Sequence, residues 1–378
     1  MFLMTTADPL QTKPVFKLDQ PDDNYKFQPL PSPVGEYPYH LSADKILPHI
    51  SDQKIIFHVL GDTGSVRHPE NIGVIASAMA RQYDTADVNE RPQFLYHLGD
   101  IVYNYGEAEY YDEQFFTPYK NYPGPIFAIA GNHDSDINTA NPVPYKSLDA
   151  FAKVFCDTIS RPVSLGGGAG KTSMVQPNIY WTLKTPLVNI IGLHSNVPKF
   201  GVITAEQREW FAEELKANNR ERPEKALFVC LHHAPYSADI NHGSSQPMIE
   251  LLEDVFEETG TKPDLVMSGH VHNYQRFNKI YNDSKALTYI VAGAGGFDEL
   301  HAVAQPDDKR FTSDDHLFDN IRLVKYCDSK HGFLKMAIEK AAEGLTITGE
   351  YYTVAGEQTE LDNQTTLTDR FTLQIPQK

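Results

Sequence analysis

The chain has 378 residues, of which 41% are hydrophobic and 22% are charged, and its formal net charge is −17. The strong negative charge argues against nucleic acid or an anionic membrane as the main partner. No apolar run approaches the roughly 20 residues that a membrane-spanning helix needs. The composition is that of a globular protein with one large domain or two smaller ones. An anionic substrate would have to be held by a strong local positive charge, which a metal cluster would supply.

The first 50 residues are rich in Pro, Asp and Tyr and show no clear periodicity. We therefore expect residues 1–50 to be an extended segment laid over a core that residues 51–378 form. The start of the chain has neither the basic nor the apolar region of a secretory signal, which predicts a cytoplasmic protein if the chain is full length and a periplasmic or secreted one otherwise. The three cysteines, Cys156, Cys230 and Cys327, are widely spaced and imply no disulfide framework.

Predicted strands and helices alternate along most of the chain. Apolar runs predict strands at 54–60, 94–98, 126–130, 179–183, 188–193, 226–231, 264–267 and 289–292. Helices are expected at about 69–83, 148–155 and 246–258, and the aromatic stretch 105–122 is interpreted as a helix and loop. A further helix follows Thr204, which forms a capping box with Gln207. Three more strands near 333–338, 345–354 and 371–375 complete the pattern of one α/β sandwich domain.

A glycine-rich stretch at residues 166–172 looks like a phosphate-binding loop. The pattern needs a further glycine where this chain has Leu165, so the match fails. We interpret the stretch as an ordinary flexible loop that could border the site.

Polar side chains of metal-binding type stand where five of the predicted strands end. They are Asp62, Asp100 with Tyr103, Asn132 with His133, His233, and His270 with His272. Open α/β sheets bind ligands outside the carboxyl ends of their strands, so these groups can converge. A pair of metal ions about 3.5–4 Å apart needs a bridging carboxylate and a shell of nitrogen and oxygen donors. Carboxylate, amide and imidazole donors without a thiolate suit Fe, Zn or Mn.

Each of these residues also has an ordinary structural interpretation. A strand-end aspartate such as Asp62 is more often a turn former when taken alone. Tyr103 is one of 20 tyrosines, and His242 taken alone would be a plain loop histidine. The joint occurrence of ligands at five strand ends favours a metal site. Three other histidines on or near apolar strands are interpreted as buried structural residues: His58, His97 and His194.

The motifs GDTG (61–64), GDIVY (99–103), GNHD (131–134), a strand-end histidine before Ala-Pro, and GHVH (269–272) resemble those of the calcineurin-like metallophosphoesterases. Within that superfamily the chain looks most like the purple acid phosphatases. Gly64 stands where the wider superfamily has a histidine, and Tyr103 stands three residues after Asp100. The resemblance covers about residues 54–296. It implies a four-layer α/β/β/α sandwich of two mixed sheets flanked by helices, with residues 51–378 as the catalytic domain.

The resemblance also implies a set of metal ligands. Asp62, Asp100, Tyr103 and His272 would bind one ion, expected to be Fe(III), and Asp100 would bridge to a divalent ion (Fe, Zn or Mn) completed by Asn132, His233 and His270. His233 is preferred to the adjacent His232 because the family's ligand stands two residues before a proline, here Pro235, and nine before a later histidine, here His242.

The implied activity is hydrolysis of phosphate monoesters by attack of metal-bound hydroxide on a small-molecule substrate. His133 and His242 would hydrogen-bond the phosphoryl group or protonate the leaving alkoxide, and Asp134 would orient His133. The ligands do not separate monoesters from diesters, so a phosphodiesterase or nucleotide hydrolase is the first alternative. The second is a non-catalytic scaffold, which is disfavoured because every motif position carries a competent residue.

Overall fold

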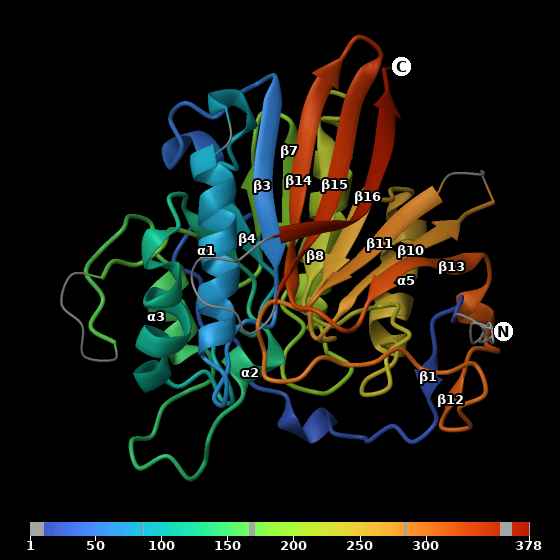
Figure 1. Cartoon of the computed structure of the whole chain (residues 1–378), viewed down its shortest axis with the longest axis horizontal. Coiled ribbons are helices and arrows are strands. Elements are labelled where there is room, and N and C mark those ends of the chain that lie inside the picture. Colours follow the sequence, from blue (N-terminus) through green and yellow to red (C-terminus); the bar gives the residue numbers. More distant parts are fainter. Residues whose placement is uncertain (1–10, 86, 166–170, 283–285, 356–364, 378) are drawn as a thin grey trace, which may run out of the picture.

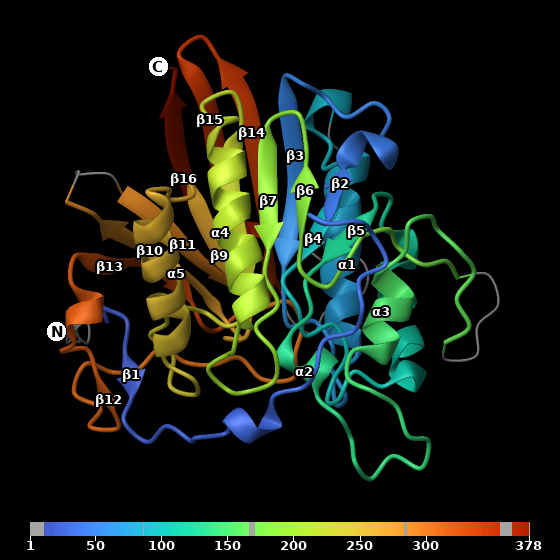
Figure 2. The same cartoon turned by 180° about the vertical axis from the view of Figure 1, so that it is seen from behind.

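The computed structural model describes residues 11–85, 87–165, 171–282, 286–355 and 365–377. Two mixed β-sheets pack face to face, with helices on their outer faces (Figures 1 and 2). This arrangement confirms the predicted fold class. None of the helices in the described part of the chain is long and apolar enough to span a membrane.

The first sheet has six strands in the order β16-β15-β14-β3-β4-β5. Its parallel half consists of β3 (Lys54–Leu60), β4 (Leu95–His97) and β5 (Ile126–Ala128). Its antiparallel half consists of β14 (Gly332–Ala341), β15 (Gly344–Val354) and β16 (Thr365–Pro376). All of these strands were predicted from apolar runs, and β3 has the predicted bounds.

The second sheet has eight strands in the order β13-β10-β11-β9-β8-β7-β6-β2. These are β13 (Ile321–Cys327), β10 (Tyr274–Ile280), β11 (Ala286–Ala292), β9 (Leu265–Ser268), β8 (Ala226–Leu231), β7 (Val188–Gly192), β6 (Trp181–Lys184) and β2 (His40–Ser42). The central four, β11, β9, β8 and β7, are parallel. The apolar runs did not predict three strands of this sheet, β2, β10 and β13. Of these, β10 and β13 alternate buried with partly or fully exposed residues along much of their length.

Helices cover the outer face of each sheet. The helix α1 (Glu70–Thr85) stands to the left of β3 in Figure 1, and α4 (Ala205–Asn219) and α5 (Gln246–Thr259) lie in front of the eight-stranded sheet in Figure 2. The capping prediction for α4 is confirmed, since the Thr204 hydroxyl accepts a hydrogen bond from the Gln207 amide. The remaining α-helices are α2 (Asn132–Ser135) and α3 (Asp149–Phe155), and short 3₁₀ or π turns cover 24–26, 43–45, 88–90, 108–110, 112–116, 118–121 and 316–318.

The core lies between the two sheets and contains large aromatic side chains. Trp181 of β6 is fully buried, and its indole N–H donates to the carbonyl of Ala128 in β5, 3.1 Å away, which ties the two sheets together. Phe94 and Phe57 stack with ring centres 4.7 Å apart beside the same interface. Burial of such rings removes a large apolar area from water and fixes how the two sheets face each other.

Residues 11–50 run from one side of the molecule to the other. Residues Phe16–Lys17 (β1) pair with Phe311–Thr312 (β12), and β2 adds an edge strand beside β6. Between these two points the segment passes along the end of the sheets at which α2 lies (Figure 2). The glycine-rich stretch at 166–170 falls outside the described residues.

Candidate metal centre

Five strands of the two sheets end at the same end of the molecule. Asp62, Asp100 and Asn132 follow β3, β4 and β5 of the first sheet, and the paired histidines 232–233 and His270 follow β8 and β9 of the second. Asp62, Asp100 and His270 have positive φ angles of 59°, 54° and 67°. Such conformations are uncommon for residues other than glycine and tend to cluster at functional sites. The chain therefore turns sharply at each of these three residues.

Two glycines allow the turns to approach one another closely. Gly99, with φ of +96°, has no space for a side chain because an added Cβ would lie 2.6 Å from the Gly131 nitrogen. At Gly131 an added Cβ would lie within 2.1 Å of the Asp100 carboxylate. The carboxylate of Asp100 is therefore enclosed by the backbone of the neighbouring turn.

One half of the site brings a phenol, two carboxylates and an imidazole together. The Tyr103 hydroxyl donates to Asp100 Oδ2 at 2.9 Å and lies 3.3 Å from Asp62 Oδ1. His272 Nε2 lies 3.2 Å from the same hydroxyl and 3.6 Å from Asp62 Oδ1. The Nδ1 of His272 is 3.2 Å from the Glu299 carbonyl, so Nδ1 carries the hydrogen and Nε2 presents its lone pair to the group.

The other half of the site is built around Asn132. Its Oδ1 lies 2.9 Å from His270 Nδ1 and 3.1 Å from His232 Nε2. His232 Nε2 is also 3.2 Å from Asp100 Oδ2. Asp100, His232 and His270 can offer ligand atoms that all lie within 4.8 Å of one another. The carboxylate of Asp100 is therefore shared by the two halves, in the position that a bridging ligand would occupy.

Both histidines of the pair 232–233 are candidate ligands, since their ring centres lie 5.2 Å and 4.3 Å from that of His270. His232 Nδ1 donates to the Leu98 carbonyl at 2.8 Å, which leaves Nε2 facing the acceptor oxygens of Asp100 and Asn132. The Nδ1 of His233 instead lies 2.7 Å from the Ser195 hydroxyl, and its Nε2 has no hydrogen-bond partner among the described residues. Both residues follow the end of β8, and of the two it is His232 whose Nε2 lies 3.2 Å from the Asp100 carboxylate.

The site attracts positive charge. Burial raises the pKa of Asp62 to about 8; the charge of His232 opposes this shift and the nearby Asp100 adds to it. Burial alone would raise the pKa of Asp100, but the charges of His232 and His133 lower it overall. Burial likewise disfavours a charged His232, yet the Asp100 and Asp62 carboxylates raise its pKa to about 9. A proton on Nε2 or a metal ion can supply the charge that these buried carboxylates require.

The donor set fits metal ions. Its carboxylate, phenol, amide and imidazole groups are nitrogen and oxygen ligands without a thiolate, which suits Fe, Zn or Mn. Asp62, Asp100 and Tyr103 are at most 1% exposed, and the buried His270 Nε2 lacks a hydrogen-bond partner within the described ranges. Buried groups of this kind are costly unless a partner satisfies them, and a cation would do so.

The three residues assigned catalytic roles from the sequence differ in what they contact. The His133 amide donates to Asp100 Oδ1 at 2.9 Å, and its ring nitrogen Nδ1 lies 2.7 Å from the Asn104 carbonyl. The Asp134 carboxylate accepts from the amides of Ile101, Val102 and Gly131 at 2.8–3.1 Å. The ring of His133 is therefore oriented by a backbone carbonyl, whereas Asp134 holds together the two turns that carry Asp100 and His133.

His242 lies on the opposite wall of the site. The centre of its ring is 4.0 Å from that of His270 and 6.5 Å from that of His272. Its Nδ1 is buried and has no hydrogen-bond partner in the part of the chain that the structure describes. The expected position of His242 beside the metal ligands is thus observed, without showing a role for it.

The sequence analysis missed His301, which lies in the loop after β11. Its ring stacks on that of His272 with centres 4.2 Å apart and planes 25° apart. Its Nδ1 is 3.2 Å from Asp239 Oδ2, and the Asn241 side-chain amide lies 2.9 Å from its Nε2. No motif surrounds this histidine, and the only available signal was its place after a predicted strand that ends in glycines.

The three histidines interpreted as structural, His58, His97 and His194, are all at most 1% exposed.

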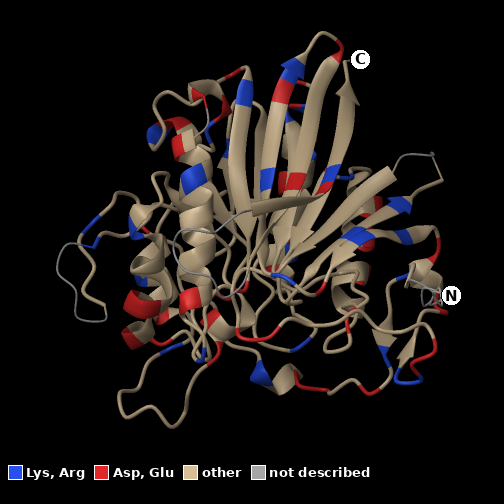
Figure 3. Ribbon diagram, in the orientation of Figure 1, with Lys and Arg blue, Asp and Glu red and all other residues tan. Residues whose placement is uncertain are grey.

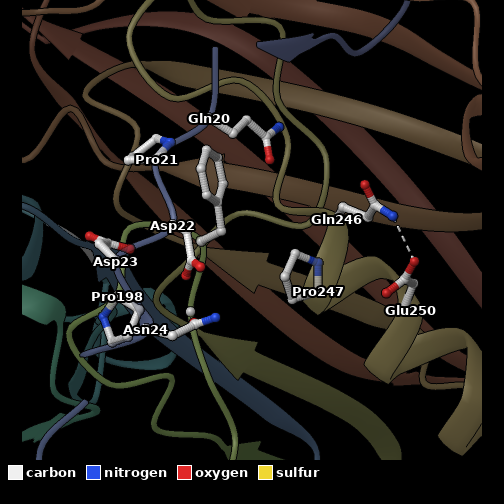
Figure 4. A pocket seen from close by; sticks show the side chains of 11 residues that line it. Gln20, Pro21, Asp22, Asp23, Asn24, Pro198, Gln246, Pro247 and Glu250 are labelled. Atoms are coloured by element: carbon white, nitrogen blue, oxygen red, sulfur yellow. Dashed lines mark hydrogen bonds between the residues drawn. The ribbon is translucent and has the colours of Figure 1, made fainter. Parts of the chain in front are cut away.

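A separate pocket of about 340 Å³ lies between residues 20–24 and the start of α5 (Figure 4). Asp22, Asp23 and Glu250 contribute acidic side chains to its lining. None of the expected metal ligands lines it. It therefore adds nothing to the candidate metal centre.

Comparison with known proteins gives a consistent assignment. Residues 56–274 match the sequence model of the family described as calcineurin-like phosphoesterase. The chain is 24% identical over 275 residues to purple acid phosphatase 15 of Arabidopsis thaliana, covering 64% of this chain and 48% of that protein. It is 30% identical over 139 residues to purple acid phosphatase 1 of Ipomoea batatas, covering 32% of this chain and 28% of that protein. The chain thus spans about half or less of the length of these curated relatives.

Two solved structures share the fold. GAP50, the anchor in the inner membrane complex of Plasmodium, superposes with a TM-score of 0.55 at 15% identity, covering 86% of this chain and 90% of that one. PhoD superposes with a TM-score of 0.52 at 13% identity, covering 92% of this chain and 72% of that one. At such low identity these likenesses show the fold alone.

Proposed function

This chain belongs to the calcineurin-like phosphoesterase family, and from that premise we propose that it is an acid-phosphatase-type hydrolase of small-molecule phosphate monoesters. The observation that carries the proposal is the position of Asp100. Its carboxylate contacts Tyr103 on one side and His232 on the other, so that one oxygen faces both halves of the donor set. A bridging carboxylate of this kind is what a pair of catalytic metal ions requires.

The family binds two metal ions, and we assign their ligands as follows. The first ion, proposed to be Fe(III), would be held by Asp62, Asp100, Tyr103 and His272, and the second, divalent ion by Asp100, Asn132, His232 and His270. When bound, such ions neutralise phosphoryl oxygens and lower the pKa of an attacking water molecule. We further propose residues 51–378 as the catalytic domain, bordered by the N-terminal segment 1–50.

The residues of the chain itself would place the substrate and handle its proton. Because His133 Nδ1 donates to the Asn104 carbonyl, its Nε2 is the nitrogen that remains to bind a phosphoryl oxygen or the leaving group. Asp134 acts as a positioning residue, since its three amide contacts fix the turns of Asp100 and His133. His242 supplies a second imidazole from the opposite wall.

The Tyr103→Phe variant tests the proposed iron site. A phenolate on Fe(III) absorbs visible light, so iron-loaded wild-type protein is expected to be coloured and the variant to be colourless. The variant also loses the 2.9 Å hydrogen bond from Tyr103 to Asp100 but keeps the buried ring. An absorption spectrum together with the iron content checks this prediction. Colourless wild-type protein that contains two Zn or Mn ions would contradict the Fe(III) assignment without contradicting hydrolysis.

The proposed substrate class is tested by comparing kcat/KM for a nitrophenyl phosphate monoester with that for the matching diester, on protein of known metal content. We expect a preference for the monoester, since His133 and His242 place two imidazole rings beside the proposed metal ligands. A preference for the diester would keep the metal site but make the protein a phosphodiesterase. If fully metallated protein turned over neither ester, the scaffold interpretation would replace general ester hydrolysis.

A further inference from the structure

We propose that Lys17 and Lys199 form an anion-binding subsite beside the metal centre, which selects substrates with a second phosphate group. The inference rests on the proposed function and names its substrate class. The side-chain ammonium groups of both lysines donate to one acceptor, the backbone carbonyl of Asn241, at 3.3 Å and 3.4 Å. Lys17 comes from β1 of the N-terminal segment, and Lys199 from the loop between β7 and α4.

The two lysines bring like charges together, and the carboxylates of Asp23 and Asp239 act on Lys199 as counter-charges. Neither makes an ion pair with a carboxylate anywhere in the described parts of the chain. Burial lowers the pKa of Lys199, and the nearby charge of Lys17 lowers it further. A single carbonyl oxygen is a weak partner for two ammonium groups, whereas a phosphate offers several charged acceptor oxygens.

The carboxylates nearest to the two lysines already have other partners. Asp23 pairs with Lys26 at 3.2 Å and accepts from the Lys199 backbone amide. Asp239 lies 3.2 Å from His301 Nδ1 and accepts from the backbone amides of residues 241–243. The chain as a whole carries a charge of −17, and Asp and Glu are spread around this end of the molecule (Figure 3). Because the nearest carboxylates already have partners, the positive charge of Lys17 and Lys199 is available to a ligand.

The subsite adjoins the metal centre. Asn241 directly precedes His242, whose ring centre is 4.0 Å from that of the proposed ligand His270. The Asn241 side chain lies 2.9 Å from His301, and His301 stacks on the proposed ligand His272. A substrate whose first phosphate is bound at the metal centre can thus direct a second anionic group past His242 toward the two lysines.

The N-terminal segment is held firmly enough to make Lys17 a fixed part of the site. The Val15 amide donates to the Ser237 carbonyl, and the Val15 carbonyl accepts from the Ser244 amide, both at 2.8 Å. Gly243, with φ of +69°, lets the segment approach, since an added Cβ would lie 3.0 Å from the Val15 oxygen. These contacts hold the segment that carries Lys17 in place beside Asn241.

The test compares wild-type protein with the double variant Lys17→Gln/Lys199→Gln. The matched control is Lys13→Gln/Lys309→Gln, which makes the same charge change near the same segment at two exposed lysines. Activity is measured on nitrophenyl phosphate, on fructose 1,6-bisphosphate and on inorganic tripolyphosphate. Binding of tripolyphosphate to the metallated protein is measured by calorimetry, and the metal content is assayed before and after the titration so that chelation of the metal ions is detected.

We expect the ratio of kcat/KM for the bisphosphate to that for nitrophenyl phosphate to fall about tenfold or more in the double variant, and tripolyphosphate to bind about tenfold more weakly. The control variant should change neither quantity by more than about twofold. If only kcat/KM for fructose 1,6-bisphosphate falls, the second group that the lysines bind is an organic phosphate ester. If only binding and turnover of tripolyphosphate fall, the second group that the lysines bind is part of a phosphate chain.

The subsite is refuted if the double variant and the control behave alike, or if activity on nitrophenyl phosphate falls as much as activity on the bisphosphate. Failure of the proposed function looks different, because metallated wild-type protein would then hydrolyse none of the three substrates. In that case the calorimetric comparison still decides the subsite. Equal binding of tripolyphosphate to wild type and double variant would overturn it.

Discussion

The His232→Ala variant is expected to lose the second metal ion and at least about 1000-fold in kcat/KM for a phosphate monoester. His232 Nε2 lies 3.2 Å from the shared Asp100 oxygen and 3.1 Å from Asn132 Oδ1, so its removal takes a nitrogen donor from the centre of the site. It also leaves two buried acceptor oxygens without their partner. Metal content by elemental analysis and steady-state kinetics on the same preparation check the result.

The control is His233→Ala, which removes the same side chain one residue along the strand. His233 contacts the Ser195 hydroxyl and packs against the His270 ring, with ring centres 4.3 Å apart. This variant is expected to lower Tm but to keep both metal ions and most of its activity. The opposite pattern, with metal lost from His233→Ala and retained by His232→Ala, would show that His233 is the ligand, as its spacing to Pro235 predicted.

The second large effect is expected for His133→Ala. This variant should retain both metal ions and lose about 100- to 10,000-fold in kcat, the range associated with a general acid or a comparable proton donor. The reason is that only the ring is removed. The backbone amide of His133 still donates to Asp100 Oδ1, so the carboxylate keeps its 2.9 Å contact.

Two measurements separate this role from a structural one. Loss of the proposed role should lower kcat at an unchanged metal content and Tm, whereas a merely weakened fold would lower Tm together with kcat. The variant His316→Ala, which removes an exposed histidine, serves as the control and should match wild type. Loss of metal from His133→Ala would show that the ring is a ligand and that the proposed role is wrong.

Much of the fold could be predicted because its central strands are buried on both faces. Runs such as KIIFHVL in β3 and ALFVCL in β8 are continuously apolar or buried, and both strands have the predicted bounds. The strand β10 was missed because the sequence YQRFNKI mixes polar with apolar residues. Its place in the sheet is set by antiparallel pairing with β11 and β13, which is a tertiary interaction that local pattern does not reveal.

The site could be predicted in outline because the carboxyl ends of parallel strands lie at one end of a sheet. His270 and His272 reach different halves of the site because the chain turns between them. The structure shows that turn, with φ of +67° at His270, and places His270 beside Asn132 and His272 beside Tyr103.

The spacing to Pro235 favours His233, whereas the contact with Asp100 favours His232. Both residues follow the end of β8 with ring centres 5.5 Å apart, and which one faces Asp100 depends on how the strand packs between β7 and β9. His301 could not be found either, because it reaches His272 from a loop. The contact is held by the backbone hydrogen bond from the His301 amide to the His272 carbonyl at 3.0 Å.

The central claim is that this chain holds two metal ions on one shared carboxylate and uses them to hydrolyse phosphate esters. The most direct test is elemental analysis of the purified protein, combined with nitrophenyl phosphate turnover before chelation, after chelation and after reloading. We predict two metal ions per chain, loss of turnover on chelation and recovery on reloading. Turnover that survives complete removal of metal, or a fully loaded protein that holds a single ion, would contradict the claim.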